Sequence, residues 1–189
     1  MAALQAKEKL RHRGFFAELP MSRVIAIGAV IVLAVAIQSA LLVHATVLGV
    51  IPQLVLVVIV CFAYTDGERM GVVTGFCGGL LVDLLLPGSS VVGLTALIYT
   101  LLGYAVDYFR QFAPGESVLL PVVAVALASA VAEMGYALLS IMMGMEWVSI
   151  GFTAKVAGLV VLYNTLLTPF AFPLVARVAT RFNRERVYR

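Results

Sequence analysis

Six long apolar runs, separated by short charged or turn-forming segments, dominate this 189-residue chain. A helix needs about 20 mainly apolar residues to cross the hydrocarbon core of a bilayer, so each run has roughly the length of one span. Only 12% of the residues are charged, against about 25% in soluble domains, which excludes a water-soluble globule and a nucleic-acid-binding domain. The sequence therefore predicts an all-α integral membrane protein. We expect a six-helix transmembrane bundle with spans at 24–43, 48–64, 71–86, 93–109, 118–143 and 152–176.

Basic residues are distributed unevenly around these spans. With six spans both chain ends lie on one side, and twelve of the 13 Lys and Arg residues then fall on that side, with Lys155 the exception. Because cytoplasmic loops and tails of membrane proteins are enriched in Lys and Arg, we predict that both termini are cytoplasmic. Residues 1–22 form a basic leader, either an interfacial helix on anionic lipid or a disordered segment. Residues 23–178 form the membrane domain, and 179–189 form a basic cytoplasmic tail.

The third run carries a regular glycine pattern. Gly71, Gly75, Gly79 and Asp83 recur every four residues, so they lie on one face of a helix. Glycines at this spacing let two helix backbones approach closely, which favours helix packing in lipid. We therefore expect a packing groove that ends in a carboxylate near the outer surface of the membrane.

Four charged side chains fall inside the predicted spans: Asp83, Glu133 and Lys155, and also Asp107, which lies at the inner end of its span. A charge at the bilayer centre costs about 2.5–3.5 kcal/mol on insertion scales, so each needs a partner or a function. Asp83 and Lys155 lie at similar depth near the outer helix ends, and we predict that they form an ion pair. The alternative is that backbone amides of the Pro87–Gly88 turn cap Asp83 while Lys155 extends outward. Glu133 lies near mid-depth, either as a proton- or cation-linked site or as a protonated acid that is hydrogen-bonded inside the bundle.

The residue combinations that enzymes use are missing from the sequence. His12 lies in the leader and His44 at an outer helix end, so they cannot form a catalytic pair or a metal site inside the bundle. No phosphate-binding glycine loop followed by lysine is present. We therefore predict no catalytic activity, no metal and no cofactor.

Residues 71–109 resemble the signature of the rod shape-determining protein MreD family. The matching positions are Gly75-Phe76, the stretch from Gly79 to Asp83, Gly93, and Leu97-Ile98-Tyr99 followed by Gly103. The sixth span is similar to the end of that family, with Asn164, Pro169 and Pro173 before a basic tail.

This resemblance implies a non-catalytic subunit of the bacterial cell-elongation machinery, the elongasome, as a multi-pass protein of the cytoplasmic (inner) membrane. Such a subunit binds MreC, a single-span protein with a large outer domain. Through MreC it connects to cytoplasmic MreB filaments and to the synthases of sidewall peptidoglycan, and thereby influences cell shape. The family is also similar in fold to the substrate-capture (S) components of energy-coupling-factor vitamin transporters.

We expect this chain to act as a scaffold through helix packing, with Asp83 as a structural residue and membrane lipid around the bundle. The candidate partner faces carry small residues: Ala36 and Ala40 in the first span, and Ala124, Ala128 and Ala132 in the fifth. Which face binds MreC stays open. Two alternatives also stay open. An S component would need an outward pocket lined by polar groups, and a proton-coupled carrier would be centred on Glu133.

Overall fold

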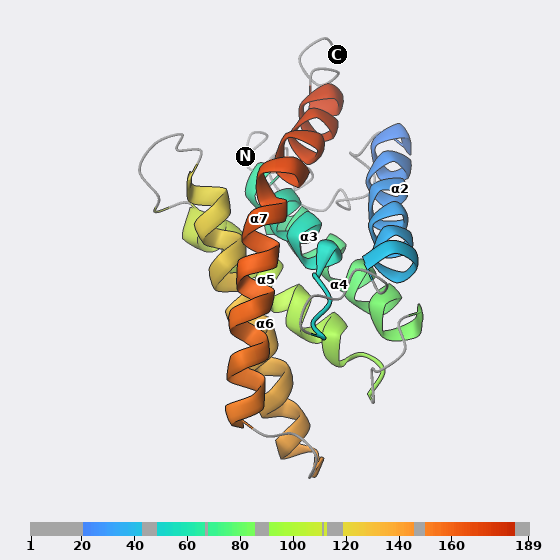
Figure 1. Ribbon diagram of the computed structural model, residues 1–189. Coiled ribbons are helices and arrows are strands. Elements are labelled where there is room, and N and C mark those ends of the chain that lie inside the picture. The colour runs from blue at the N-terminus through green and yellow to red at the C-terminus, as the bar shows by residue number, and fades with distance from the viewer. Residues whose placement is uncertain are drawn as a thin grey trace, which may run out of the picture.

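A computed structural model describes residues 21–42, 49–66, 68–85, 91–110, 112, 119–145 and 150–183. The leader up to residue 20, both histidines, the Pro87–Gly88 turn and residues 184–189 lie outside the described residues. Within the described ranges the regular elements are six α-helices and one short π-helix. They are α2 (Met21–Ile37), η2 (Gln38–Leu42), α3 (Leu54–Asp66), α4 (Glu68–Leu85), α5 (Leu94–Arg110), α6 (Leu119–Met142) and α7 (Ile150–Asn183) (Figure 1).

Each α-helix corresponds to one of the six predicted spans, and the chain is a membrane protein by helix length and composition. Three helical segments are long and apolar enough to cross a bilayer: Met21–Ala40, Leu119–Met142 and Gly151–Arg181. α3 has only 13 residues and therefore covers about 20 Å. This is less than the ~30 Å of hydrocarbon that a spanning segment must cross. The start of α3 must therefore find its hydrogen-bond partners inside the bundle.

The helices are arranged as two hairpins around a central helix. α4 packs mainly on α5, α6 packs mainly on α7, and α3 contacts all four of them. Every residue from Val55 to Ala63 is buried, as expected for a helix that is apolar on all sides and enclosed by neighbours. α2 lies at the edge of the bundle, where Ile25 and Val32 remain exposed.

Arginines gather at one end of the bundle, which we call the basic end. Arg23 lies at the start of α2, Arg110 is the last residue of α5, and Arg177 and Arg181 lie near the end of α7. Figure 1 shows the first turn of α2 and the last turn of α7 at the same end of the molecule. α7 contains Pro169 and Pro173, and it bends between its orange lower part and its red upper part (Figure 1).

Candidate functional site

The start of α3 is the most polar part of the bundle interior. The first amides of a helix have no intrahelical acceptor, so those of α3 need partners from elsewhere in the bundle. Asn164 of α7 accepts a hydrogen bond from the backbone N–H of Gln53 through Oδ1 at 2.9 Å. Gln38 of η2 accepts one from the N–H of Val55 through Oε1 at 3.0 Å. Two amide side chains from other helices therefore cap the start of α3.

The side chain of Gln53 extends this capping into a network. Its Nε2 donates a hydrogen bond to Oε1 of Glu133, and the hydroxyl of Tyr99 donates to its Oε1 at 3.5 Å. Asn164 Nδ2 donates in turn to the hydroxyl of Ser129 at 2.8 Å. We call these side chains the polar cluster: Gln38, Gln53, Tyr99, Ser129, Glu133 and Asn164.

The polar cluster joins side chains from several helices at the start of α3. Its members come from η2, the residue before α3, α5, α6 and α7, and most are buried, with Ser129 and Asn164 at 0% exposure. Glu133 approaches the start of α3, where the helix dipole favours a negative or hydrogen-bond-accepting group. Within the described residues no group of three His, Cys, Asp or Glu side chains could hold a metal ion. The cluster is therefore a hydrogen-bonded junction between helices.

Sequence reasoning identified only part of this cluster. Glu133 stood out because it can carry a charge, and Tyr99 and Asn164 because they belong to resembling segments. Gln53 was not identified because it is uncharged and lies inside an apolar run. The available signal was its position directly after Pro52, because proline is favoured at the start of a helix and the first amides of a helix need acceptors outside it.

The glycine face of α4 lies directly against the backbone of α5. A Cβ atom added to Gly71 would lie 2.5 Å from the carbonyl oxygen of Gly103, and one added to Gly79 would lie 2.5 Å from Cα of Ala96. A Cβ on Gly75 would meet the backbone carbonyl of Tyr99. These positions have no room for any side chain, so the two backbones touch along almost the full length of the hairpin.

Asp83 continues the glycine face and caps α5. Its buried carboxylate accepts hydrogen bonds through Oδ2 from the N–H of Gly93 at 2.8 Å and of Ala96 at 3.2 Å. These are the N-cap and N3 amides of α5, where a carboxylate is favoured by both hydrogen bonding and the helix dipole. One helix of the hairpin therefore caps the other.

The predicted ion pair between Asp83 and Lys155 is wrong. The side chain of Lys155 is exposed on α7, and the one ion pair found among the described residues lies elsewhere. α7 packs on α6 and α3, whereas Asp83 lies in the α4–α5 hairpin. The prediction rested on similar depth along the membrane, and depth does not specify which helices are neighbours.

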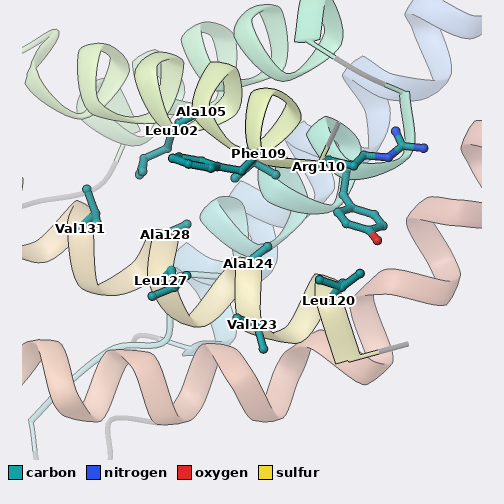
Figure 2. A pocket seen from close by; sticks show the side chains of 12 residues that line it. Leu102, Ala105, Phe109, Arg110, Leu120, Val123, Ala124, Leu127, Ala128 and Val131 are labelled. Atoms are coloured by element: carbon teal, nitrogen blue, oxygen red, sulfur yellow. The ribbon is translucent and has the colours of Figure 1, made fainter. Parts of the chain in front are cut away.

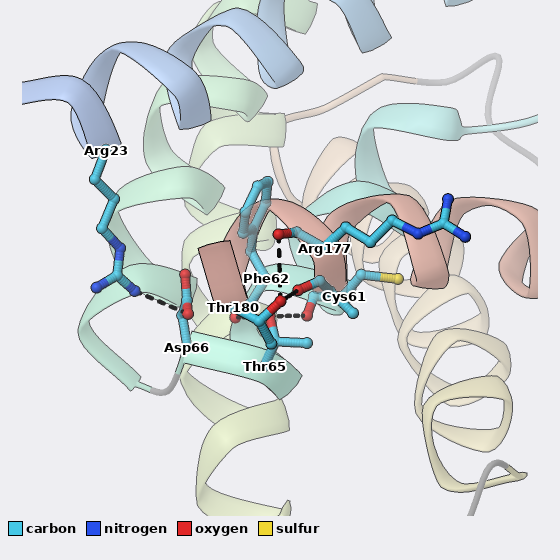
Figure 3. Close-up of polar contacts among 8 residues, drawn as sticks. Arg23, Cys61, Phe62, Thr65, Asp66, Arg177 and Thr180 are labelled. Atoms are coloured by element: carbon cyan, nitrogen blue, oxygen red, sulfur yellow. Dashed lines mark hydrogen bonds and ion pairs between the residues drawn. The ribbon is translucent and has the colours of Figure 1, made fainter. Parts of the chain in front are cut away.

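The ion pair that is present joins Arg23 to Asp66 at the basic end. Arg23 Nη2 lies 2.8 Å from Asp66 Oδ1, and the two side chains are 6% and 0% exposed (Figure 3). The pair links the first turn of α2 to the last residue of α3. Sequence reasoning assigned Arg23 only to the positive charge that orients the chain and did not pair it.

The candidate partner faces differ in exposure. Ala36 and Ala40 are exposed on the outer side of the α2–η2 segment. Ala128 and Ala132 are buried at 3% and 4%, and Ala124 is half-buried. The expectation of an exposed alanine face on the fifth span is therefore wrong, because this face of α6 points into the bundle.

Comparison with known families identifies the chain's relatives. The family described as rod shape-determining protein MreD matches residues 21–178, which is most of the chain. No curated protein and no solved structure matches. The similarity to S components of vitamin transporters therefore stays a prediction. The chain belongs to the MreD family and has a role in determining cell shape.

Proposed function

We propose that this MreD-family chain is a non-catalytic scaffold subunit of the cell-elongation complex, and that it binds MreC. In this role it helps to control sidewall peptidoglycan synthesis, with MreB and the synthases as indirect partners. The family match over residues 21–178 is the observation that carries the proposal. It is supported by an interior whose polar groups bond to one another, because such an interior favours a single rigid conformation.

We place the basic end of the bundle on the cytoplasmic side of the inner membrane. Arg23, Arg110, Arg177 and Arg181 are grouped at this end, and the positive-inside rule assigns such a group to the cytoplasm. Both chain ends are then cytoplasmic. Cysteine labelling from either side of intact cells, with single cysteines at Ser22 and at Thr180, tests this orientation. Labelling of either position from outside the inner membrane would overturn it.

We further propose that the membrane helix of MreC packs on the exposed face of the α2–η2 segment. Gly28, Val32, Ala36 and Ala40 follow one another at steps of four and are all exposed. α2 lies at the edge of the bundle, so a partner helix can approach it. Gly28, Ala36 and Ala40 are small, and small residues along one helix face permit the close backbone contact that stabilises helix pairs in lipid.

The test is co-purification of MreC with the full-length tagged chain from detergent-solubilised membranes. Ala36→Leu should lower MreC recovery by roughly tenfold, because overpacking a close contact typically costs about 1–3 kcal/mol. Ala154→Leu is the matched control, since Ala154 is also an exposed alanine and lies on α7. It should leave recovery unchanged.

The outcomes separate the two parts of the proposal. If the unmodified chain recovers no MreC, the scaffold role is refuted. Co-purification with cytoplasmic ATPases instead would point to the transporter subunit. If MreC is recovered equally with Ala36→Leu and Ala154→Leu, the scaffold role stands and the α2 face is refuted.

A further inference from the structure

An apolar groove of about 430 Å³ runs between α5 and α6, where the two helix hairpins meet (Figure 2). In Figure 2 the side chains of α5 and α6 face one another across it. Leu102 and Ala128 form its buried floor, at 7% and 3% exposure. Phe109 and Leu127 on its rim are exposed at 69% and 63%, so the groove opens outward from the bundle.

The groove has the length of one bilayer leaflet. It follows α6 from Leu120 to Val131, and eleven helical steps correspond to about 16 Å. The hydrocarbon core is about 30 Å thick, so one leaflet contributes about 15 Å. Leu120 lies one residue from the start of α6 at the basic end, which places the groove in the leaflet on that side.

The chemistry of the walls favours a hydrocarbon chain as the occupant. The side chains that line the groove are apolar apart from Tyr64 and Arg110. Water needs two to four polar partners to occupy a cavity, and these walls do not supply them along the groove. A groove that opens outward in a membrane-spanning region faces lipid acyl chains.

A cation stands at the end of the groove next to the basic surface. Arg110 is the last residue of α5, and its guanidinium lies 5.2 Å from the ring centroid of Tyr64. The side chain is exposed, and in the part of the chain that the structure describes it forms no ion pair. Basic pockets between membrane helices are where anionic lipid headgroups bind. The charge of Arg110 therefore complements a lipid phosphate.

We propose that this groove binds one anionic glycerophospholipid, with an acyl chain between α5 and α6 and its phosphate on Arg110. The lipid fills the gap between the α4–α5 and α6–α7 hairpins. It is thus a structural component of the bundle, distinct from the α2 face on which MreC is placed. The inference rests on the groove and its charge and does not depend on the proposed scaffold function.

The test measures lipid binding to the full-length chain in detergent by native mass spectrometry. Phosphatidylglycerol should bind as one retained molecule per chain, more tightly than phosphatidylcholine. Arg110→Gln should weaken phosphatidylglycerol binding about fivefold, the effect expected for one basic residue at an anionic lipid surface. Arg177→Gln is the matched control, because Arg177 is an exposed arginine at the same end that does not line the groove.

A second variant fills the groove itself. Ala105→Phe should abolish retention of both lipids, whereas Ala154→Phe, on an exposed alanine outside the groove, should leave it unchanged. The proposal is overturned if Arg110→Gln has no more effect than Arg177→Gln. It is also overturned if folded Ala105→Phe protein retains lipid normally. If that variant keeps its lipid but no longer recovers MreC, the groove is the binding site of a partner helix. Arg110→Gln alters only an exposed side chain, so this arm decides even if Ala105→Phe fails to fold.

Discussion

Replacing Gly75 with alanine tests whether α4 and α5 are in backbone contact. A Cβ atom at this position would lie 2.8 Å from the carbonyl carbon of Tyr99 and 3.0 Å from Cα of Thr100. Both are backbone atoms, so no side chain can rotate away, and carbon atoms in contact prefer about 3.5–4.0 Å. The two helices must therefore separate locally by roughly 0.5–1 Å.

The expected cost follows from two opposing terms. Overpacking a close-packed interior costs about 1–3 kcal/mol, and a clash with backbone belongs in the upper part of that range. Alanine is the better helix former by about 0.8–1.0 kcal/mol, which offsets part of the cost. We therefore expect Gly75→Ala to lower the free energy of unfolding by about 1–2 kcal/mol.

Gly28 provides the matched control for this substitution. It lies in α2, and nothing lies within 4 Å of its Cβ position. Gly28→Ala should therefore be neutral or stabilising, by up to about 1 kcal/mol. The assay is reversible unfolding of the full-length chain in mixed micelles of mild detergent and sodium dodecyl sulfate, followed by helical circular dichroism. If alanine at position 75 is tolerated as well as alanine at position 28, the backbone contact is refuted.

Gly71 and Gly103 extend the same test. A Cβ on either residue would meet the backbone of the other, so one separation of the helices relieves both clashes. The double alanine variant should therefore cost about 1 kcal/mol less than the sum of the two single variants. Strict additivity would show that the two glycines do not face each other.

Further substitutions at Asp83, Gln53, Glu133 and Arg23 probe the polar contacts with the same unfolding assay. Asp83→Ala should destabilise the chain by about 1–2 kcal/mol, because it leaves the cap amides of α5 without acceptors. Asp83→Asn keeps an acceptor oxygen and should cost less. Equal costs for the two variants would contradict a capping role. Gln53→Ala should cost about 1 kcal/mol, since interhelical hydrogen bonds in membranes average about 0.6 kcal/mol and the side chain makes two. Glu133→Gln keeps the acceptor oxygen and should cost less than that; a larger loss would show that the charge itself is required. Arg23→Gln should lower the free energy of unfolding by about 3 kcal/mol, because it leaves Asp66 buried without its cation. Combining Asp66→Leu with Arg23→Met should restore most of the lost stability. No recovery in the double variant would show that the ion pair is not the reason for the loss.

The sequence predicted the features of this fold that depend on composition and helical period. The apolar runs correspond to the helices, the arginines collect at one end, and the four-residue glycine pattern in 71–83 lies on one helix face. Each of these follows from local rules, because a spanning segment must be apolar and a step of four returns to the same side of a helix.

The choice of neighbours could not be predicted in this way. Asp83 and Lys155 were matched by depth and opposite charge, but the carboxylate bonds to backbone amides of the adjacent helix. An amide at a helix start is a strong donor that carries no mark in the sequence, since every residue except proline has one. Pairing residues by charge considers only side chains as partners. It therefore overlooks backbone amides, which are the partners of Asp83 in this chain.

The alanines of α6 show a second physical limit. In water, an apolar face indicates burial because the opposite face is polar. In a bilayer both faces are apolar, so Ala128, which is buried, and Leu127, which is 63% exposed, cannot be distinguished by hydrophobicity.

Uncharged polar residues indicate the buried face instead. Gln38, Gln53 and Asn164 each occur in an apolar segment, and each points into the bundle because an amide group facing lipid would lose its hydrogen bonds. The buried faces of the helices in this chain are therefore indicated better by its few amide side chains than by its many apolar ones.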